Sequence, residues 1–174
     1  MKQKDTETQK NLMTAFLREA GAYLEYTFYA EQAKTEGFEE IYRKFTEFAN
    51  NEKAHAKIWF KLFHGISHTQ ENLQDSMDLE NYERTVLYAE FSKKAREEGF
   101  ADIATLFDGV AEIEKQHEQD YKIMRDCVKN KCVFEKKEEV SWQCLNCGHI
   151  HYGLSAPLSC PVCSHPQAFF KVLD

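Results

Sequence analysis

The chain has 174 residues, with 22 lysines and arginines against 29 aspartates and glutamates, so its formal charge at pH 7 is −7. An acidic chain is not expected to bind nucleic acid, because the phosphate backbone attracts basic surfaces. No run of about 18 apolar residues is present, so we expect no membrane span. The polar start, residues 1–7, lacks the apolar segment of a signal peptide. We therefore expect a cytoplasmic protein.

The prolines and most of the cysteines are concentrated near the C-terminal end. All three prolines fall within residues 157–166, and four of the six cysteines fall within residues 144–163. We predict two domains, a larger one over residues 1–135 and a small one over residues 136–174. Without a secretory signal, paired cysteines are expected to be metal ligands or redox thiols rather than structural disulfides.

Apolar residues before the cysteine-rich segment recur with the spacing of amphipathic helices. Thr6 and Gln9 resemble a capping box at the start of the first helix, and Gly37 would end it. The predicted helices cover residues 6–37, 38–65, 76–98 and 100–128, with a polar loop at 65–75. Each would be roughly 40 Å long. Four long helices with mostly short connections predict an all-α, antiparallel four-helix bundle.

The second and fourth predicted helices share one pattern. The segment from Glu36 to Phe45 reads EGFxxIxxxF, and the same pattern recurs from Glu98 to Phe107. At the same offset along the chain, the pattern AxxEKxH recurs with Glu52 and His55 matched to Glu114 and His117. We infer two helix-pair repeats. Chance similarity between two amphipathic helices is the alternative, but the polar residues match as well as the apolar ones.

Carboxylates and imidazoles interrupt the apolar stripes where a bundle core is expected. The residues concerned are Glu19 in the first helix, Glu52 and His55 in the second, Glu80 and Glu83 in the third, and Glu114 and His117 in the fourth. A buried carboxylate is costly unless it is paired or binds a metal. A Glu-x-x-His motif on each of two helices, with a glutamate from each of the others, is the dinuclear carboxylate pattern. A single Glu-x-x-His more often lies on a solvated face, but two in repeat register favour a diiron-oxo site with two Fe.

Two Cys-x-x-Cys pairs, Cys144 with Cys147 and Cys160 with Cys163, predict a tetrahedral four-thiolate metal site. Iron and zinc both fit, and the metal is expected to hold this short segment together. A pair of redox dithiols is the alternative. Trp142, Tyr152, Phe169 and Phe170 are predicted to form its small aromatic core. Cys127 and Cys132 are interpreted as incidental thiols, with a disulfide or a regulatory role as the alternative, and residues 131–140 as a charged connector.

On these motifs the chain resembles the rubrerythrin family along nearly its full length. The resemblance implies a ferritin-like diiron bundle followed by a small, mostly β and loop, rubredoxin-like Fe(Cys)4 domain. It implies that the metal ligands, which are also the catalytic residues, are Glu19, Glu52, Glu80, Glu83, Glu114 and His117. His55 would exchange with the carboxylate of Glu83 as one iron shifts on oxidation.

The resemblance also implies a function. The expected activity is that of a non-haem diiron peroxidase, which reduces hydrogen peroxide to water with electrons passed through the Fe(Cys)4 centre. The donor would be an external NAD(P)H-linked reductase or a rubredoxin, and the chain would form a head-to-tail homodimer. Tyr26 and Tyr88 are expected either to hydrogen-bond near the site or to pack in the core. Two alternatives remain, a ferroxidase or iron-handling protein that uses O2 at the same site, and a non-enzymatic zinc-ribbon adaptor.

Overall fold

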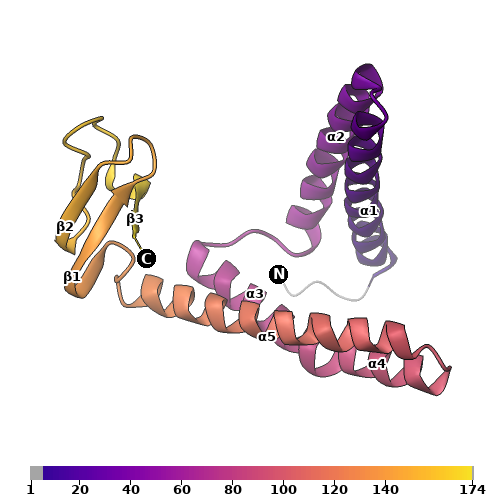
Figure 1. The fold of residues 1–174 in the computed structure, drawn as a ribbon. Coiled ribbons are helices and arrows are strands. Elements are labelled where there is room, and N and C mark those ends of the chain that lie inside the picture. The colour runs from indigo at the N-terminus through magenta and orange to yellow at the C-terminus, as the bar shows by residue number, and fades with distance from the viewer. Residues whose placement is uncertain (1–5, 174) are drawn as a thin grey trace. The chain divides into compact units, whose positions relative to one another are not determined.

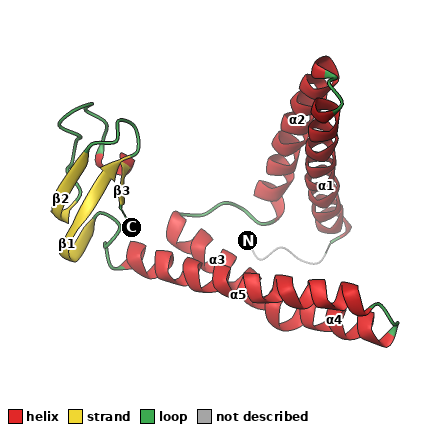
Figure 2. Ribbon diagram, viewed as in Figure 1, coloured by secondary structure: helices red, strands yellow, loops and turns green. Residues whose placement is uncertain are grey.

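The computed structural model describes residues 6–173, so residues 1–5 of the polar start lie outside the described part. The chain divides into two compact units, Met1–Ser67 and His68–Asp174, which are described in turn. Figures 1 and 2 show that helices make up the first unit and that helices followed by a small sheet make up the second. Among residues 6–173, no helix is both long and apolar enough to cross a membrane.

The first unit is a hairpin of two antiparallel helices, α1 (Glu7–Thr35) and α2 (Glu39–Phe63). The predicted capping box is confirmed, because the Thr6 side chain accepts from the Gln9 backbone N–H and the Gln9 side chain accepts from the Thr6 N–H. At the turn, Gly37 has φ +83° and the N–H of Phe38 donates to the Ala33 carbonyl at 2.9 Å. This pattern closes the end of α1 and requires a left-handed residue, which glycine supplies.

The second unit opens with another helix hairpin. A continuous helical run consists of α3 (Thr69–Tyr82), the π-helical turn η1 (Glu83–Leu87) and α4 (Tyr88–Glu97), and α5 (Ala101–Lys129) returns along it. Gly99 has φ +87°, and the N–H of Phe100 donates to the Ala95 carbonyl at 2.8 Å. The two hairpins therefore turn through the same hydrogen-bonded motif at repeat-equivalent positions.

The predicted loop at residues 65–75 is wrong, because α3 begins at Thr69 and only residues 64–68 connect it to α2. The first two turns of α3 carry few apolar residues, which is why their helical spacing was not visible. They are held by polar contacts instead. The Arg125 guanidinium of α5 donates to the Gln74 side-chain carbonyl and lies 3.5 Å from the Met77 sulfur. The connection between the two hairpins is consequently five residues long.

The π-helical turn corrects a mismatch between the repeats. The stretch from Glu80 to the turn glycine Gly99 is one residue longer than the equivalent stretch from Glu19 to Gly37. A π turn closes its hydrogen bond at i→i+5 and so accommodates one residue more than an α turn. With that residue absorbed in η1, Glu80 keeps the register that Glu19 has in the first hairpin.

The apolar stripes predicted as core are only partly covered within each unit. The buried residues of the two hairpins are small: Ala30, Ala33, Ala49, Ala56, Ser92, Ala95 and Ala104. Small side chains let the paired helices approach closely. By contrast, larger members of the stripes are about half exposed, among them Phe38, Ile41, Phe48, Phe100, Ile103 and Met124.

The C-terminal part of the second unit is a three-stranded antiparallel sheet in the order β2-β1-β3. Its strands are β1 (Glu135–Cys144), β2 (Ile150–Ser155) and β3 (Phe170–Val172), with a short 3-10 helix, η2 (Gln167–Phe169), before the last. The predicted connector at 131–140 is therefore shorter than expected, because β1 already begins at Glu135.

The core of the small sheet is centred on Trp142, which is fully buried and donates from its indole N–H to the Gly153 carbonyl at 3.0 Å. Cys144, Cys160, Ala156 and Phe170 complete the buried cluster. Of the four aromatic residues predicted for this core, Tyr152 is 65% exposed and Phe169 is 38% exposed. Two cysteines and an alanine take their place, so the metal-ligand residues are themselves part of the core.

Candidate metal centres

The first hairpin brings together three of the predicted ligands, Glu19 from α1 and Glu52 and His55 from α2, which we call the first half-site. The His55 Nδ1 atom lies 3.0 Å from Glu52 Oε2 and 3.8 Å from Glu19 Oε2. One possible ligand atom from each residue lies within 4.8 Å of the others. A hydrogen bond with Glu19 and, to a smaller extent, one with His55 lower the pKa of Glu52.

The second hairpin brings together the equivalent residues, Glu80 from α3 and Glu114 and His117 from α5, which we call the second half-site. The His117 Nδ1 atom lies 2.7 Å from Glu114 Oε2 and 3.8 Å from Glu80 Oε2. Burial, and then the neighbouring Glu114 carboxylate, raise the pKa of Glu80. The two half-sites thus repeat each other in residue type and in the nitrogen that faces the carboxylates.

Glu83 is the seventh residue predicted for this centre, and it is placed differently from the others. It is the first residue of η1 and is partly buried. Its carboxylate adds to the negative field that raises the pKa of Glu80 and of Tyr88. It is not among the three residues that converge in the second half-site. The structure therefore places Glu83 beside that half-site.

The segment that carries Glu80 and Glu83 is anchored to α5 by a residue that the sequence did not single out. The Glu118 carboxylate accepts hydrogen bonds from the Asn81 amide at 3.0 Å and from the Arg84 guanidinium at 2.9 and 3.2 Å. Asn81 and Arg84 each follow directly after one of the two glutamates. Outer partners of this kind orient metal ligands. The sequence did contain a signal for this anchor, because the acidic residue Glu118 directly follows His117.

The two tyrosines expected near the site differ. Burial, followed by the carboxylates of Glu83, Glu114 and Glu80, raises the pKa of Tyr88, which places its hydroxyl in the field of the second half-site. The Tyr88 ring also packs against Phe107, with ring centroids 6.1 Å apart. The Tyr26 ring packs 6.2 Å from that of Phe45. Tyr88 is thus the tyrosine that the structure associates with the carboxylates.

The four predicted thiol ligands converge at the end of the small sheet. Cys144 is the last residue of β1, and the two Cys-x-x-Cys loops have the same geometry. The Gly148 N–H donates to the Cys144 carbonyl and the Ser164 N–H to the Cys160 carbonyl, each at 2.9 Å. Gly148 and Ser164 both have positive φ, +77° and +59°. These matching turns direct all four thiols to one point.

The thiol geometry fits a tetrahedral metal ion. The Cys144 and Cys163 sulfurs lie 3.7 Å apart, and those of Cys147 and Cys160 lie 3.6 Å apart. Four sulfurs at the usual metal–sulfur distance of about 2.3 Å would be about 3.8 Å from one another in a tetrahedron. A hydrogen bond from the His165 backbone N–H lowers the pKa of Cys163 to about 6. Such N–H donors stabilise the thiolate form that binds metal.

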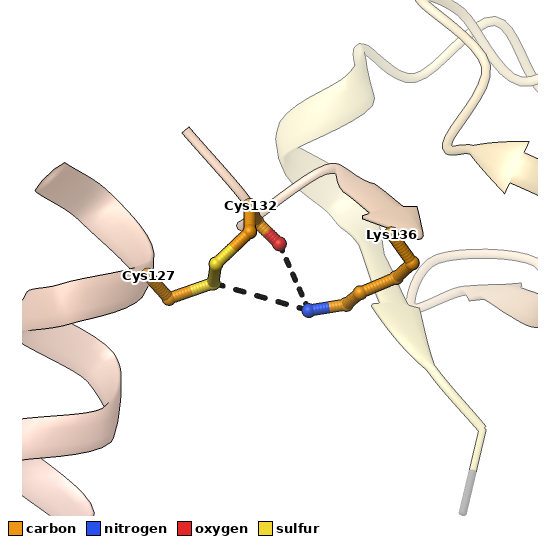
Figure 3. Close-up of a disulfide and its surroundings, with 3 residues drawn as sticks. All are labelled: Cys127, Cys132 and Lys136. Atoms are coloured by element: carbon orange, nitrogen blue, oxygen red, sulfur yellow. Dashed lines mark hydrogen bonds between the residues drawn. A yellow bond between two sulfur atoms is a disulfide. The ribbon is translucent and has the colours of Figure 1, made fainter. Parts of the chain in front are cut away.

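The remaining two cysteines correct a prediction. Cys127, in the last turns of α5, and Cys132, in the turn before β1, form a disulfide, which was the alternative to the preferred interpretation as incidental thiols. Figure 3 shows Lys136 beside the bond, with its ammonium donating to the Cys132 carbonyl at 2.8 Å and lying 3.9 Å from the Cys127 sulfur. In the sequence, the short separation between the two cysteines is the only sign of a disulfide, and the same separation is compatible with two unpaired thiols. The disulfide ties the end of α5 to the start of the small sheet.

Comparisons with known proteins show which family this chain is similar to. The Rubrerythrin family model matches residues 10–125, and the model for the rubrerythrin rubredoxin-like domain matches residues 142–171. A rubrerythrin of Porphyromonas gingivalis is 41% identical, over 97% of this chain and 90% of that protein. A rubrerythrin of Nitratidesulfovibrio vulgaris is 37% identical, over 98% and 96%. A solved structure of partially reduced nigerythrin is 26% identical over 99% of this chain and 89% of that chain, with a TM-score of 0.38.

The two family-model matches confirm the predicted fold class, an all-α ferritin-like four-helix segment followed by a small rubredoxin-like domain. They also confirm the predicted cofactors, which are two Fe in the helical domain and one Fe in the four-cysteine site. The donor sets fit those metals, with carboxylates and imidazoles in the helices and four thiols in the sheet. The chain is an iron-dependent oxidoreductase, and it belongs to the rubrerythrin family.

Proposed function

We propose that this chain reduces hydrogen peroxide to water at a two-iron centre and receives electrons through the iron of its cysteine loops. The proposed ligands of the two-iron centre are Glu19, Glu52, His55, Glu80, Glu83, Glu114 and His117, and those of the single iron are Cys144, Cys147, Cys160 and Cys163. One observation carries the proposal: a single chain contains two matching Glu/His half-sites and a four-thiol site. The four-thiol site is suited to electron transfer, which a protein that only stores iron would not need.

The reaction consumes one hydrogen peroxide, two protons and two electrons, and it yields two waters. When bound, the two irons supply the Lewis acidity and the electrons that break the O–O bond. The chain contributes the charge that holds them, because five glutamates carry −5. The two histidines complete the donor set as neutral imidazoles. Glu83 and His55 would exchange as ligands of one iron, as the family resemblance implies, and the position of Glu83 beside its half-site is compatible with this role.

The cysteine loops contribute the electron path. A single Fe(Cys)4 centre carries one electron at a time, so two deliveries are needed for each peroxide. Backbone N–H groups that point at the sulfurs tune such a centre, and the hydrogen bond from His165 to Cys163 has this role. We propose an external NAD(P)H-linked reductase or a rubredoxin as donor, and the cytoplasm as the location. We also propose that residues 1–135 and 136–174 form the two functional domains of a homodimer.

Anaerobic stopped-flow spectroscopy tests the choice of oxidant. The reduced holoprotein is mixed separately with hydrogen peroxide and with O2, and oxidation is followed in the visible spectrum. We expect much faster oxidation by peroxide, and a preference for O2 would instead support a ferroxidase. The Glu114→Ala variant should lose fast oxidation. The matched control is Glu112→Gln on the same helix, whose side chain is 73% exposed, and it should react as the wild type does.

The metal content tests whether the chain is an enzyme or an adaptor. Purified protein should contain three irons per chain and show the visible absorption of an iron–thiolate centre. A colourless protein with one zinc at the cysteine loops, after expression in iron-replete medium, would support the zinc-ribbon adaptor. Replacing Cys144 by Ser should remove the thiolate absorption but leave the two-iron content, because the carboxylate ligands lie on the helices.

A further inference from the structure

The C-terminal end of α5 closes through the same backbone motif as the two hairpin turns. The Cys132 N–H donates to the Cys127 carbonyl at 2.8 Å, and the Lys131 N–H donates to the Val128 carbonyl at 3.2 Å. This pair of bonds defines the Schellman helix end. The two hairpin turns described above contain the same pair of bonds. Three helices of this chain therefore end in one way.

The side chains at this helix end differ from those of the hairpin turns. The left-handed position is held by Lys131, with φ +58°, where the hairpin turns have Gly37 and Gly99. A residue with a Cβ is strained in this conformation, whereas glycine is not. An apolar contact between the outer residues of the motif commonly supports a Schellman end. Here those residues are Cys127 and Cys132, and they are covalently bonded instead.

The restraint that this disulfide imposes is local. It joins residues with a sequence separation of 5, and a disulfide restrains the unfolded chain less when the loop it closes is short. The small domain has its own core around Trp142 and its own four-thiol site. The disulfide therefore mainly fixes the joint between α5, which carries part of the second half-site, and β1, which ends at Cys144.

An open pocket gives small molecules access to one of the two cysteines. The pocket has a volume of about 660 Å³ and contains Cys132 in its lining, but not Cys127. The other lining residues are Asn130, Lys131, Glu135, Lys136 and Lys137. A small thiol that enters this pocket therefore meets Cys132 and not Cys127.

Lys136 is placed to assist the departure of the other sulfur. Its ammonium donates to the Cys132 carbonyl at 2.8 Å and lies 3.9 Å from the Cys127 sulfur, as Figure 3 shows. A nearby cation stabilises a thiolate, and a disulfide opens faster when the departing sulfur is a well-stabilised thiolate. The pocket and the lysine thus act on different sulfurs, which defines a direction of attack.

We propose that Cys127 and Cys132 form a reversible redox site that small thiols open and that controls the end of α5. First, the thiolate of an external thiol attacks the Cys132 sulfur, a mixed disulfide forms, and Cys127 leaves with the bonding electron pair as a thiolate. A second external thiol then attacks the external sulfur of the mixed disulfide and releases Cys132. The protein gains two electrons and two protons, and the two external thiols lose them and depart as a disulfide.

The reverse reaction, with a small disulfide as oxidant, closes the site again. Because the site lies outside both candidate iron centres, the proposal does not depend on the function proposed above. Its structural consequence follows from Lys131. Reduction removes the cross-link across a strained left-handed residue, so the end of α5 should open more often.

Trapping the mixed disulfide tests the direction of attack. The full-length, iron-loaded protein is oxidised with a small disulfide, treated briefly with 2-mercaptoethanol, quenched with N-ethylmaleimide and analysed by peptide mass spectrometry. We expect the mercaptoethanol adduct on Cys132 and the maleimide on Cys127. The opposite pattern would overturn the assigned direction. If the bond does not form, or stays closed until the iron–thiolate absorption is lost, the proposal as a whole is wrong.

The opening rate tests the role of Lys136. Lys136→Met should slow opening by dithiothreitol, which is uncharged, severalfold. Lys137→Met removes an equal charge from the lining of the same pocket and is the matched control, so it should open at the wild-type rate. Equal slowing in both variants would reveal a general effect of charge and overturn the role of Lys136 in stabilising the departing thiolate.

Amide hydrogen exchange tests whether the redox site controls the end of α5. Reduction of the holoprotein should speed exchange at the Lys131 and Cys132 amides severalfold, because both bond to carbonyls within the turn. The Phe38 and Phe100 amides make the bond equivalent to that of Cys132 without a disulfide, so their exchange should not change. If exchange at Cys132 is the same in the oxidised and reduced protein, the disulfide does not control this helix end.

Substitution of Lys131 tests the physical reason for this control. Lys131→Gly removes the strain of the left-handed position, so its turn should stay protected from exchange after reduction. Lys131→Ala removes the same ammonium but keeps a Cβ, and it should respond to reduction as the wild type does. If the glycine and alanine variants respond alike, strain at Lys131 is not what the disulfide offsets.

Discussion

The Glu118 carboxylate on α5 accepts two hydrogen bonds from the Arg84 guanidinium on η1, at 2.9 and 3.2 Å. The same carboxylate accepts from Asn81. Because Arg84 follows Glu83 and Asn81 follows Glu80, this one side chain fixes the segment that presents both glutamates. The first hairpin has no counterpart, since the residue equivalent to Glu118 there is Ala56. The two half-sites are alike in their ligands but differ in their support.

Replacing Glu118 by Gln should weaken iron binding at the two-iron centre. The change keeps the shape of the side chain but removes the charge that pairs with Arg84, so the segment with Glu80 and Glu83 becomes less well fixed. Losing an outer partner of metal ligands typically costs about 10- to 100-fold in metal affinity. The measurement is iron retention during titration with a chelator, and the iron–thiolate absorption serves as an internal reference.

Glu112→Gln is the control for this change. Its carboxylate lies on the same helix and pairs with Lys115, and its side chain is 73% exposed. It should retain iron as the wild type does. If Glu118→Gln and Glu112→Gln lose iron at the same chelator concentration as the wild type, Glu118 has no part in positioning the centre.

Asp108 should make the stability of the second hairpin depend on pH in the acidic range. Hydrogen bonds from Ser92 and then from Arg96 lower the pKa of Asp108. A lowered folded pKa means that the stabilisation is present above the unfolded pKa of about 3.9 and is lost as the pH falls through the folded value. Asp108→Asn should therefore lower the melting temperature at pH 7, and the difference from wild type should shrink below about pH 4.

Circular dichroism during heating of the holoprotein, repeated at several pH values, measures this effect. Glu112→Gln removes an exposed carboxylate from the same helix and serves as the reference for a general change in charge. The contribution of Asp108 must vanish when its carboxylate is protonated. A difference in melting temperature between wild type and Asp108→Asn that stays constant from pH 7 to the lowest pH measured would therefore contradict the assignment.

Much of the helical fold could be predicted because its signals are local. Gly37 and Gly99 stop their helices through backbone conformation, and the ligand motifs of α2 and α5 recur at one offset, so chance was an unsatisfactory explanation. The start of α3 could not be predicted in this way. Gln74 is held by Arg125, which lies far along the chain on α5, and a polar long-range contact leaves no apolar periodicity in the sequence.

The π-helical turn was missed although a signal existed. The stretch from the ligand glutamate to the turn glycine is one residue longer in the second repeat than in the first, and one additional residue in a helix calls for a π turn. The core of the small sheet was predicted from aromatic residues, yet Tyr152 is mostly exposed. The alternation of apolar and polar residues along a short strand does not show which core positions are taken by metal-binding cysteines instead of aromatic residues.

Lys136 should govern how quickly the disulfide between Cys127 and Cys132 forms. Its ammonium lies 3.9 Å from the Cys127 sulfur, and a nearby positive charge favours the reactive thiolate. Lys136→Met should slow reoxidation of the reduced protein by oxidised glutathione severalfold, as measured by trapping free thiols over time. Lys137→Met, one residue along and exposed, should leave the rate unchanged. Equal rates for all three proteins would exclude Lys136 as the residue that activates Cys127.

The two cysteine loops should respond in opposite directions to substitution at their matching positions. Gly148 and Ser164 both have positive φ, a conformation that costs a residue with a Cβ roughly 1 kcal/mol or more. Gly148→Ala should therefore destabilise the small domain by about 1 kcal/mol, since a Cβ there meets no neighbour within 4 Å and the strain lies in the backbone. Ser164→Gly should stabilise it by up to about 1 kcal/mol. Denaturant titration followed by iron–thiolate absorption measures both changes.

Ser155→Gly on β2, where φ is not positive, is the control and should be destabilising instead. If Ser164→Gly lowers stability as much as Ser155→Gly does, backbone strain at Ser164 does not limit the stability of this domain.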